Sequence, residues 1–175
     1  SIMSYSYLIK KTNFPVVLIP VIKVLSGMIV HFILLGIFVA LIIFYYGLTP
    51  SIHWVQIIYY QFVIIFLMTG IGLFVSSVNV FVRDIAHIVN ILVTMLFWAT
   101  PLIWNFSRLE GNYRYIAFLN PFFYITEGYR YTFVGKKWFF EYTEMNIFFW
   151  SVSIFIFIVG VLTFRKLRPH FGDVL

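Results

Sequence analysis

Long apolar stretches alternate with short polar connections along this chain. A helix needs about 20 mainly apolar residues to cross about 30 Å of hydrocarbon. The pattern predicts four membrane spans, at residues 20–46, 54–77, 88–104 and 145–164. Lys23, near the start of the first span, is the only charged residue inside them. Residues 47–53 (GLTPSIH) are typical of a tight turn, and residues 78–87 of a short link. We therefore expect an all-α polytopic membrane protein.

The composition narrows the class of protein further. Of 175 residues, 62% are hydrophobic and 10% are charged, whereas a soluble domain has about 45–50% and about 25%. This balance, with a mean hydropathy of +0.98, excludes a disordered tail and an ordinary soluble enzyme. The absence of cysteine excludes thiol catalysis, Cys-ligated zinc and a disulfide scaffold. The net charge of +6 comes from cations at span ends, which indicates membrane topology, and we expect no nucleic-acid partner.

The distribution of cations predicts the orientation, because cytoplasmic loops carry an excess of Lys and Arg. With both ends of the chain in the cytoplasm, seven cations lie inside: Lys10, Lys11, Lys23, Arg83, Arg165, Lys166 and Arg168. Five cations then lie outside: Arg108, Arg114, Arg130, Lys136 and Lys137. We therefore expect both ends of this segment to be cytoplasmic.

The connection between the last two spans, residues 105–144, is long and aromatic. Its residues 115–126 (YIAFLNPFFYIT) are apolar but too few to cross a bilayer. Asn120-Pro121 favours an extended or turning backbone at residue 120. Glu127 and Arg130 follow, three residues apart, so that they can pair on one helix face. On composition the segment is either a re-entrant hairpin or an aromatic belt at the lipid headgroups.

The polar groups inside the spans favour structural roles. The spans contain no Asp or Glu, and His31, the only imidazole well inside one, is typical of a hydrogen-bonded packing residue. Gly70 and Gly72 suit close helix approach. The other histidines lack metal-ligand spacing, so we expect no metal site. The sequence contains no P-loop, and we expect any ATP to be bound by another chain.

Four stretches together resemble one family. They are the opening YLIKKTNFPVVLIPVIKVLS, the link NVFVRDIAHIVNIL, the outer FWATPLIW with LNPFFYITEGYRYTFVG, and the ending VGVLTFRKLRPHFGDVL. In this order they are similar to the permeases of type-2 ABC transporters that export polysaccharides. The Asp-Val-Leu ending and the Phe-, Ile-, Tyr- and Lys-rich composition resemble wall teichoic acid exporters most. O-antigen and capsule exporters share the pattern.

The resemblance implies an architecture in the bacterial cytoplasmic membrane. Family members have six spans, so residues 1–175 would be a single, partial permease domain, its carboxyl-terminal two-thirds. Two permeases would pair around a path for lipid-linked polysaccharide, and two cytoplasmic ATPases would supply ATP and Mg, with no cofactor on this chain. Residues 112–135 would then be a re-entrant outer hairpin that gates the path.

Candidate functional residues follow from that architecture. Aromatic faces can stack on sugars and cations can bind phosphates. The predicted path and gate residues are Trp98, Trp104, Tyr113, Arg114, Tyr115, Asn120, Pro121, Phe122, Phe123, Tyr124, Glu127, Tyr129 and Arg130. The predicted ATPase-coupling residues are Lys10, Lys11, Phe14, Arg83 and Asp84. We expect no catalytic residue on this chain.

Two other classes of protein remain as alternatives. A membrane-embedded transferase for lipid-linked sugars would need an acid or base near the headgroups, and only Glu127, Glu141 and Glu144 are available. A scaffolding membrane subunit would not need the broken, charged segment at 112–135. An export permease accounts for both the small number of acidic groups and the broken, charged segment at 112–135.

Overall fold

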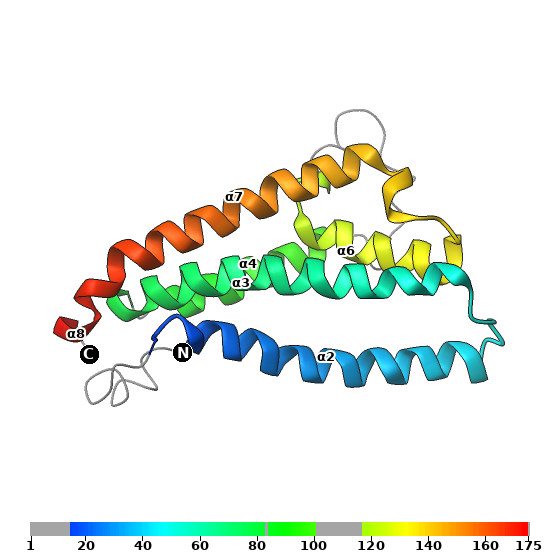
Figure 1. The fold of residues 1–175 in the computed structure, drawn as a ribbon, viewed down its shortest axis with the longest axis horizontal. Coiled ribbons are helices and arrows are strands. Elements are labelled where there is room, and N and C mark those ends of the chain that lie inside the picture. Colours follow the sequence, from blue (N-terminus) through cyan, green and yellow to red (C-terminus); the bar gives the residue numbers. More distant parts are fainter. Residues whose placement is uncertain (1–14, 83, 101–116, 175) are drawn as a thin grey trace.

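Helices form the whole regular structure of the part described by the computed structural model, which is residues 15–82, 84–100 and 117–174. Three long helices run side by side: α2 (Leu18–Phe44), α3 (Ile57–Phe81) and α7 (Thr143–Leu167) (Figure 1). A short 3₁₀ helix, η2 (Ile52–Gln56), leads into α3. Each long helix is apolar and long enough to cross a membrane. The chain is therefore a multi-pass membrane protein.

The predicted spans 20–46, 54–77 and 145–164 correspond to these three helices. The predicted link at 78–87 is shorter than expected, because α3 continues to Phe81 and α4 (Ile85–Ala99) starts four residues later. Val80 stays helical because its side chain is buried in the packed core. The helix α4 has 15 residues, fewer than a span needs, and residues 101–104 lie outside the described residues. The fourth span stays a prediction.

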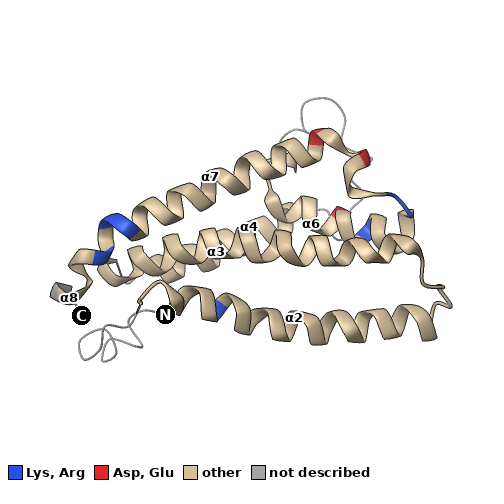
Figure 2. Ribbon diagram, in the orientation of Figure 1, with Lys and Arg blue, Asp and Glu red and all other residues tan. Residues whose placement is uncertain are grey.

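The charged residues of the described part of the chain lie mainly toward the two ends of the bundle and on the short helix between them, α6 (Pro121–Arg130) (Figure 2). The central stretches of α2, α3 and α7 carry none. This distribution is the one that a membrane imposes, because a charge facing hydrocarbon is costly.

Two glycines bring α3 and α7 into close contact. A Cβ atom on Gly70 would lie 2.8 Å from the Cα atom of Phe157, and one on Gly160 would overlap the carbonyl oxygen of Gly70. Small residues at such crossings let two membrane helices approach closely. The close approach predicted at Gly70 is confirmed. At Gly72 the approach is an ordinary contact, because a Cβ there would lie 3.6 Å from Val24 of α2.

The carboxyl-terminal tail folds back against the start of the bundle. After α7, the short helices η6 (Arg168–His170) and α8 (Phe171–Val174) follow. The Phe171 side chain is only 1% exposed. It packs in an apolar cluster with Val16, Ile19, Leu73, Val80 and Phe164. This cluster joins α2, α3 and α7 at one end of the bundle, which we call the tail end.

The opposite end of the bundle, the turn end, is held by Gln56. Gly47 turns the chain between α2 and α3 with a positive φ of 64°. Gln56 Nε2 donates to the Lys137 carbonyl oxygen at 2.8 Å, and its Oε1 accepts from the Phe139 backbone N–H at 2.9 Å. Both bonds tie the start of α3 to the segment that precedes α7, which includes η5 (Phe139–Glu141).

Candidate functional site

The helix α6 lies at the centre of the region that the sequence predicts as a gate. It starts at Asn120, whose backbone is extended (ψ 107°) and whose Oδ1 accepts from the Phe122 backbone N–H at 3.0 Å. Pro121 occupies the first helical position, where its fixed φ and missing N–H are no disadvantage. The extended backbone predicted at residue 120 is thus confirmed. A π-helical turn, η4 (Tyr131–Gly135), continues the helix.

Most of α6 is buried within this chain. Its buried residues are Pro121, Phe123, Tyr124, Ile125, Glu127 and Gly128. Gly128 lies directly against the Tyr60 ring of α3, where any side-chain carbon would overlap that ring. Tyr60, Val63, Leu67 and Phe149 belong to the same core cluster as the buried α6 aromatics. The helix is therefore packed into the bundle rather than laid on its surface.

A hydrogen-bond chain centred on Tyr124 joins α6 to α3 and α7. The hydroxyls of Tyr59 and Tyr124 lie 3.0 Å apart, and Tyr124 donates to the Asn146 side-chain oxygen. Trp150 Nε1 donates to the Tyr59 hydroxyl at 3.0 Å. Since apolar surroundings leave few other partners for these groups, the chain fixes the position of α6.

A second chain, centred on Tyr129, joins α6 to α2 and α3. Its hydroxyl lies 3.1 Å from His31 Nε2 and accepts from Gln61 Nε2 at 2.8 Å. The prediction that His31 is a hydrogen-bonded packing residue is confirmed. The Gln61 Oε1 atom is buried and has no hydrogen-bond partner among the residues that the structure describes.

The predicted pairing of Glu127 with Arg130 is also confirmed, because Arg130 Nη1 donates to Glu127 Oε1. Glu127 is 3% exposed, whereas 41% of the Arg130 side chain is exposed. Burial raises the pKa of the Glu127 carboxyl, while the Arg130 charge and hydrogen bonds from Tyr131 and Arg130 oppose the shift. The ion pair therefore reaches from the buried face of α6 to its surface.

By contrast, α4 is linked to the start of α6 by hydrogen bonds of the Asn120 side chain, and the rest of the described chain does not bury the residues of α4. Asn120 Nδ2 donates to Thr100 Oγ1 at 2.9 Å and to the Leu96 carbonyl oxygen at 3.3 Å. No residue of α4 is buried within the described part of the chain. Trp98, near its end, is 66% exposed. The surface of α4 is thus available to lipid, polymer or another polypeptide.

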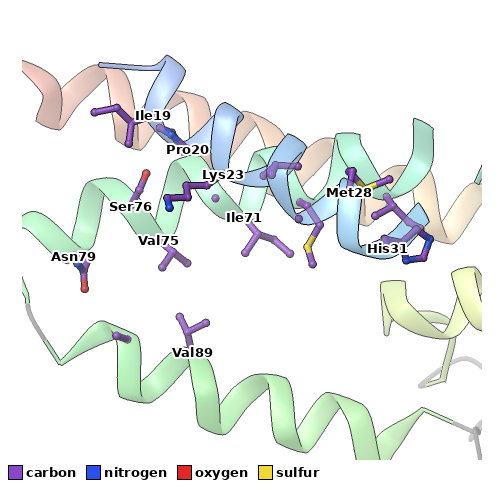
Figure 3. A pocket seen from close by; sticks show the side chains of 16 residues that line it. Ile19, Pro20, Lys23, Met28, His31, Ile71, Val75, Ser76, Asn79 and Val89 are labelled. Atoms are coloured by element: carbon purple, nitrogen blue, oxygen red, sulfur yellow. The ribbon is translucent and has the colours of Figure 1, made fainter. Parts of the chain in front are cut away.

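Between α2, α3 and α4 lies an apolar cavity of about 670 Å³, within the size range of ligand pockets. Lys23 points from α2 into this cavity near Ser76, and Val75 and Val89 face each other across it (Figure 3). His31 lines its other end. Sequence reasoning missed the cavity, because its walls come from three helices. The sequence feature that could have indicated the cavity is the pair Gly27 and Gly72, which both line it.

The structure brings together only part of the predicted path. Phe123 and Tyr124 are buried in the core, while Phe122 and Tyr129 are partly buried. Asp84 is exposed at the start of α4. The remaining predicted residues lie outside the described residues: Lys10, Lys11, Phe14, Arg83, Trp104, Tyr113, Arg114 and Tyr115. All assigned roles stay predictions.

The described part of the chain is a multi-pass helical bundle with a short, buried helix between its long ones. Residues 2–134 match the family model described as ABC-2 type transporter. The chain belongs to that family, and the resemblance predicted from its motifs is confirmed.

Two curated relatives are similar along the whole chain. Both are O-antigen export system permease proteins RfbA from Klebsiella pneumoniae, each 27% identical over 179 aligned positions. Each alignment covers 100% of this chain and 66% of the relative. The chain thus spans just under two thirds of the length of these relatives.

Proposed function

We propose that this protein is the transmembrane subunit of an ATP-driven exporter that moves lipid-linked polysaccharide across the bacterial cytoplasmic membrane. The observation that carries the proposal is the similarity of the entire chain to polysaccharide export permeases. The three apolar helices supply a membrane body for such a role. A cytoplasmic ATPase subunit, holding ATP and Mg, and a second copy of the permease complete the assembly.

The tail end of the bundle faces the cytoplasm in this proposal. Arg165, Lys166 and Arg168 are exposed there, directly after the uncharged stretch 145–164 of α7, and suit the anionic inner leaflet. The turn end, with Lys136 and Lys137, then faces outward. Asp84 lies on the cytoplasmic side, between α3 and α4, where the ATPase would bind.

The short helix α6 is the returning arm of the outer hairpin in this proposal. Its first residues lie beside the end of α4, through the bonds of Asn120, and it runs toward the turn end (Figure 1). A belt at the headgroups would expose one face to lipid and the other to water. The burial of α6 between α3 and α7 supports the hairpin instead.

The polymer would pass along α4 and the hairpin, where exposed aromatic faces such as Trp98 can stack on sugar rings. The relatives export O-antigen by name, and this favours an O-antigen-type polysaccharide as cargo. Wall teichoic acid is the second candidate. It rests on the sequence resemblance of the Asp-Val-Leu ending and of the Phe-, Ile-, Tyr- and Lys-rich composition.

Depletion of the full-length permease in its own cells tests the proposal. We expect lipid-linked polymer to accumulate in the cytoplasm and surface polymer to fall, while polymer synthesis continues. Chemical analysis of the accumulated polymer distinguishes sugar repeats from polyol phosphate. Unchanged surface polymer after depletion would refute the export function.

A further inference from the structure

We propose that His31 is a positioning residue that holds the hairpin helix α6 against α2 through the Tyr129 hydroxyl. This inference rests on the proposed export function and names the residue through which α2 and the gate move together. Neither the family match nor the names of the relatives assigns a role to this histidine.

His31 lies in the middle of α2, where a hydrogen bond of an ionisable side chain matters most. His31 is at the centre of α2 (Leu18–Phe44), so that about 20 Å of helix extends on either side at 1.5 Å per residue. This is the middle of a membrane span, where an ionisable side chain without a partner is costly and its partner indicates its function. The partner is Tyr129, 98 positions further along the chain.

The joint brings two side chains to one hydroxyl. Gln61 Nε2 donates to the Tyr129 oxygen at 2.8 Å, and His31 Nε2 lies 3.1 Å from the same oxygen. Three helices meet at one hydroxyl, and removing either neighbour leaves a polar group of the joint with fewer partners.

The joint is a hydrogen-bonded attachment in the middle of α2, a helix that buries few residues. Only four α2 residues are buried, namely Ile19, Pro20, Met28 and Ile42. Two of them lie in the first turn, at the tail end. On the turn-end side of His31, the ring of Phe38 meets that of Phe133 from η4 at 5.3 Å. Without His31, apolar contacts alone would hold this half of α2 to the hairpin.

His31 also lines the outer end of the cavity between α2, α3 and α4. One imidazole thus contacts both the cavity and the hairpin. A displacement of α2 at His31 would change the distance between His31 Nε2 and the Tyr129 hydroxyl. This contact gives the bundle a short physical route to the gate.

The experiment uses the full-length permease with its ATPase, and cysteine pairs that report helix proximity. A pair at Phe38 and Phe133 reports the contact of α2 with the hairpin. A control pair at Phe66 and Phe157, whose rings stack at 4.7 Å, reports the contact of α3 with α7. Each pair is placed in the parent, in His31→Leu, in His31→Gln and in Tyr129→Phe.

We expect His31→Leu and Tyr129→Phe to lower cross-linking of the first pair and polymer export per ATP by roughly three- to twenty-fold, the range of interhelical hydrogen bonds in membranes. His31→Gln keeps a side chain that can donate or accept a hydrogen bond and should remain near the parent. The double variant should be no worse than Tyr129→Phe alone, because that variant already removes the His31 bond together with the Gln61 bond.

Unchanged cross-linking of the first pair in His31→Leu would overturn the proposal. Multiplicative effects in the double variant would also overturn it, and so would an equal fall in the control pair, which indicates general loosening. The cross-linking readout does not require export. Failure of export in the parent would therefore refute the proposed function and leave the joint to be judged separately.

Discussion

The two sides of the bundle differ in how completely the chain covers its own surface. Around α3, α6 and α7, side chains interlock through the Gly70–Gly160 crossing and the Tyr124 hydrogen-bond chain. Around α2 and α4, a cavity separates the helices, and no residue of α4 is buried in the described part of the chain. The packed side, formed by α3, α6 and α7, is held together by contacts within this chain. The open side, formed by α2 and α4, exposes apolar surface to lipid or to another molecule.

Because of this difference, we expect the packed side to determine stability and the open side to determine transport. Tightly packed interiors respond to a single added or removed methyl group. Open apolar surfaces tolerate such changes, and in a membrane protein they face lipid, cargo or another polypeptide. Substitutions on the α3–α6–α7 side should therefore destabilise the protein, and substitutions on the α2–α4 side should alter export at constant stability.

The largest effect on stability should come from Gly160→Ala. A methyl group there meets the backbone of Gly70, so that α3 and α7 must separate, at a cost of about 1–3 kcal/mol. Gly36→Ala is the matched control, because a Cβ at Gly36 meets nothing within 4 Å. It should be neutral or stabilise the helix by about 0.4–1 kcal/mol. Equal unfolding free energies in detergent would contradict the packing account.

Tyr124→Phe should have the next largest effect. It leaves Asn146 and Tyr59 without a shared buried partner, which costs about 1–2 kcal/mol in unfolding free energy. Tyr46→Phe, at a site 72% exposed, should change stability by less than about 0.5 kcal/mol. A Tyr124→Phe protein as stable as Tyr46→Phe would show that the hydrogen-bond chain does not hold α6.

Asn120→Ala should cost about 1 kcal/mol through the lost helix cap. It also removes the bonds to Leu96 and Thr100, the side-chain link between α6 and α4. Hydrogen exchange should therefore increase at the end of α4 more than in α7. Asn120→Ser keeps a cap and should restore the start of α6 but not the link to α4.

The smallest effect on stability should accompany a clear effect on export. Gly27 lines the cavity, and a Cβ there meets nothing within 4 Å, so Gly27→Leu adds an apolar side chain that begins in open space at the cavity wall. Gly36→Leu adds the same side chain to α2 outside the cavity lining. Export should fall in the Gly27 variant alone, at equal protein level. Equal export in both would mean that the cavity has no part in transport.

Local sequence patterns predicted the features that depend on neighbouring residues. The three long helices follow from apolar run length, the Glu127–Arg130 pair from a spacing of three, and the start of α6 from Asn120-Pro121. Each of these rests on geometry within one helix or at its end. Such features need no knowledge of the partner helix.

Features built from distant parts of the chain could not be predicted in the same way. The sequence places Tyr124 among the predicted path residues, but it gives no sign that the Tyr124 hydroxyl lies 3.0 Å from that of Tyr59, 65 positions earlier. His31 and Tyr129 are separated by 98 positions. Aromatic residues look alike in sequence whether they line a path or a core. Only the packing of α6 decides which rings are covered.

The central claim, that polymer passes along α4 and the hairpin and not along α7, can be tested with one matched pair of photoreactive residues. Trp98 of α4 and Phe155 of α7 are both 66% exposed. Each is replaced by a photoreactive amino acid in the full-length permease, in cells whose ATPase is blocked with polymer in transit. We predict polymer adducts at position 98 and only lipid adducts at position 155. Polymer adducts at position 155 and none at position 98 would contradict the account.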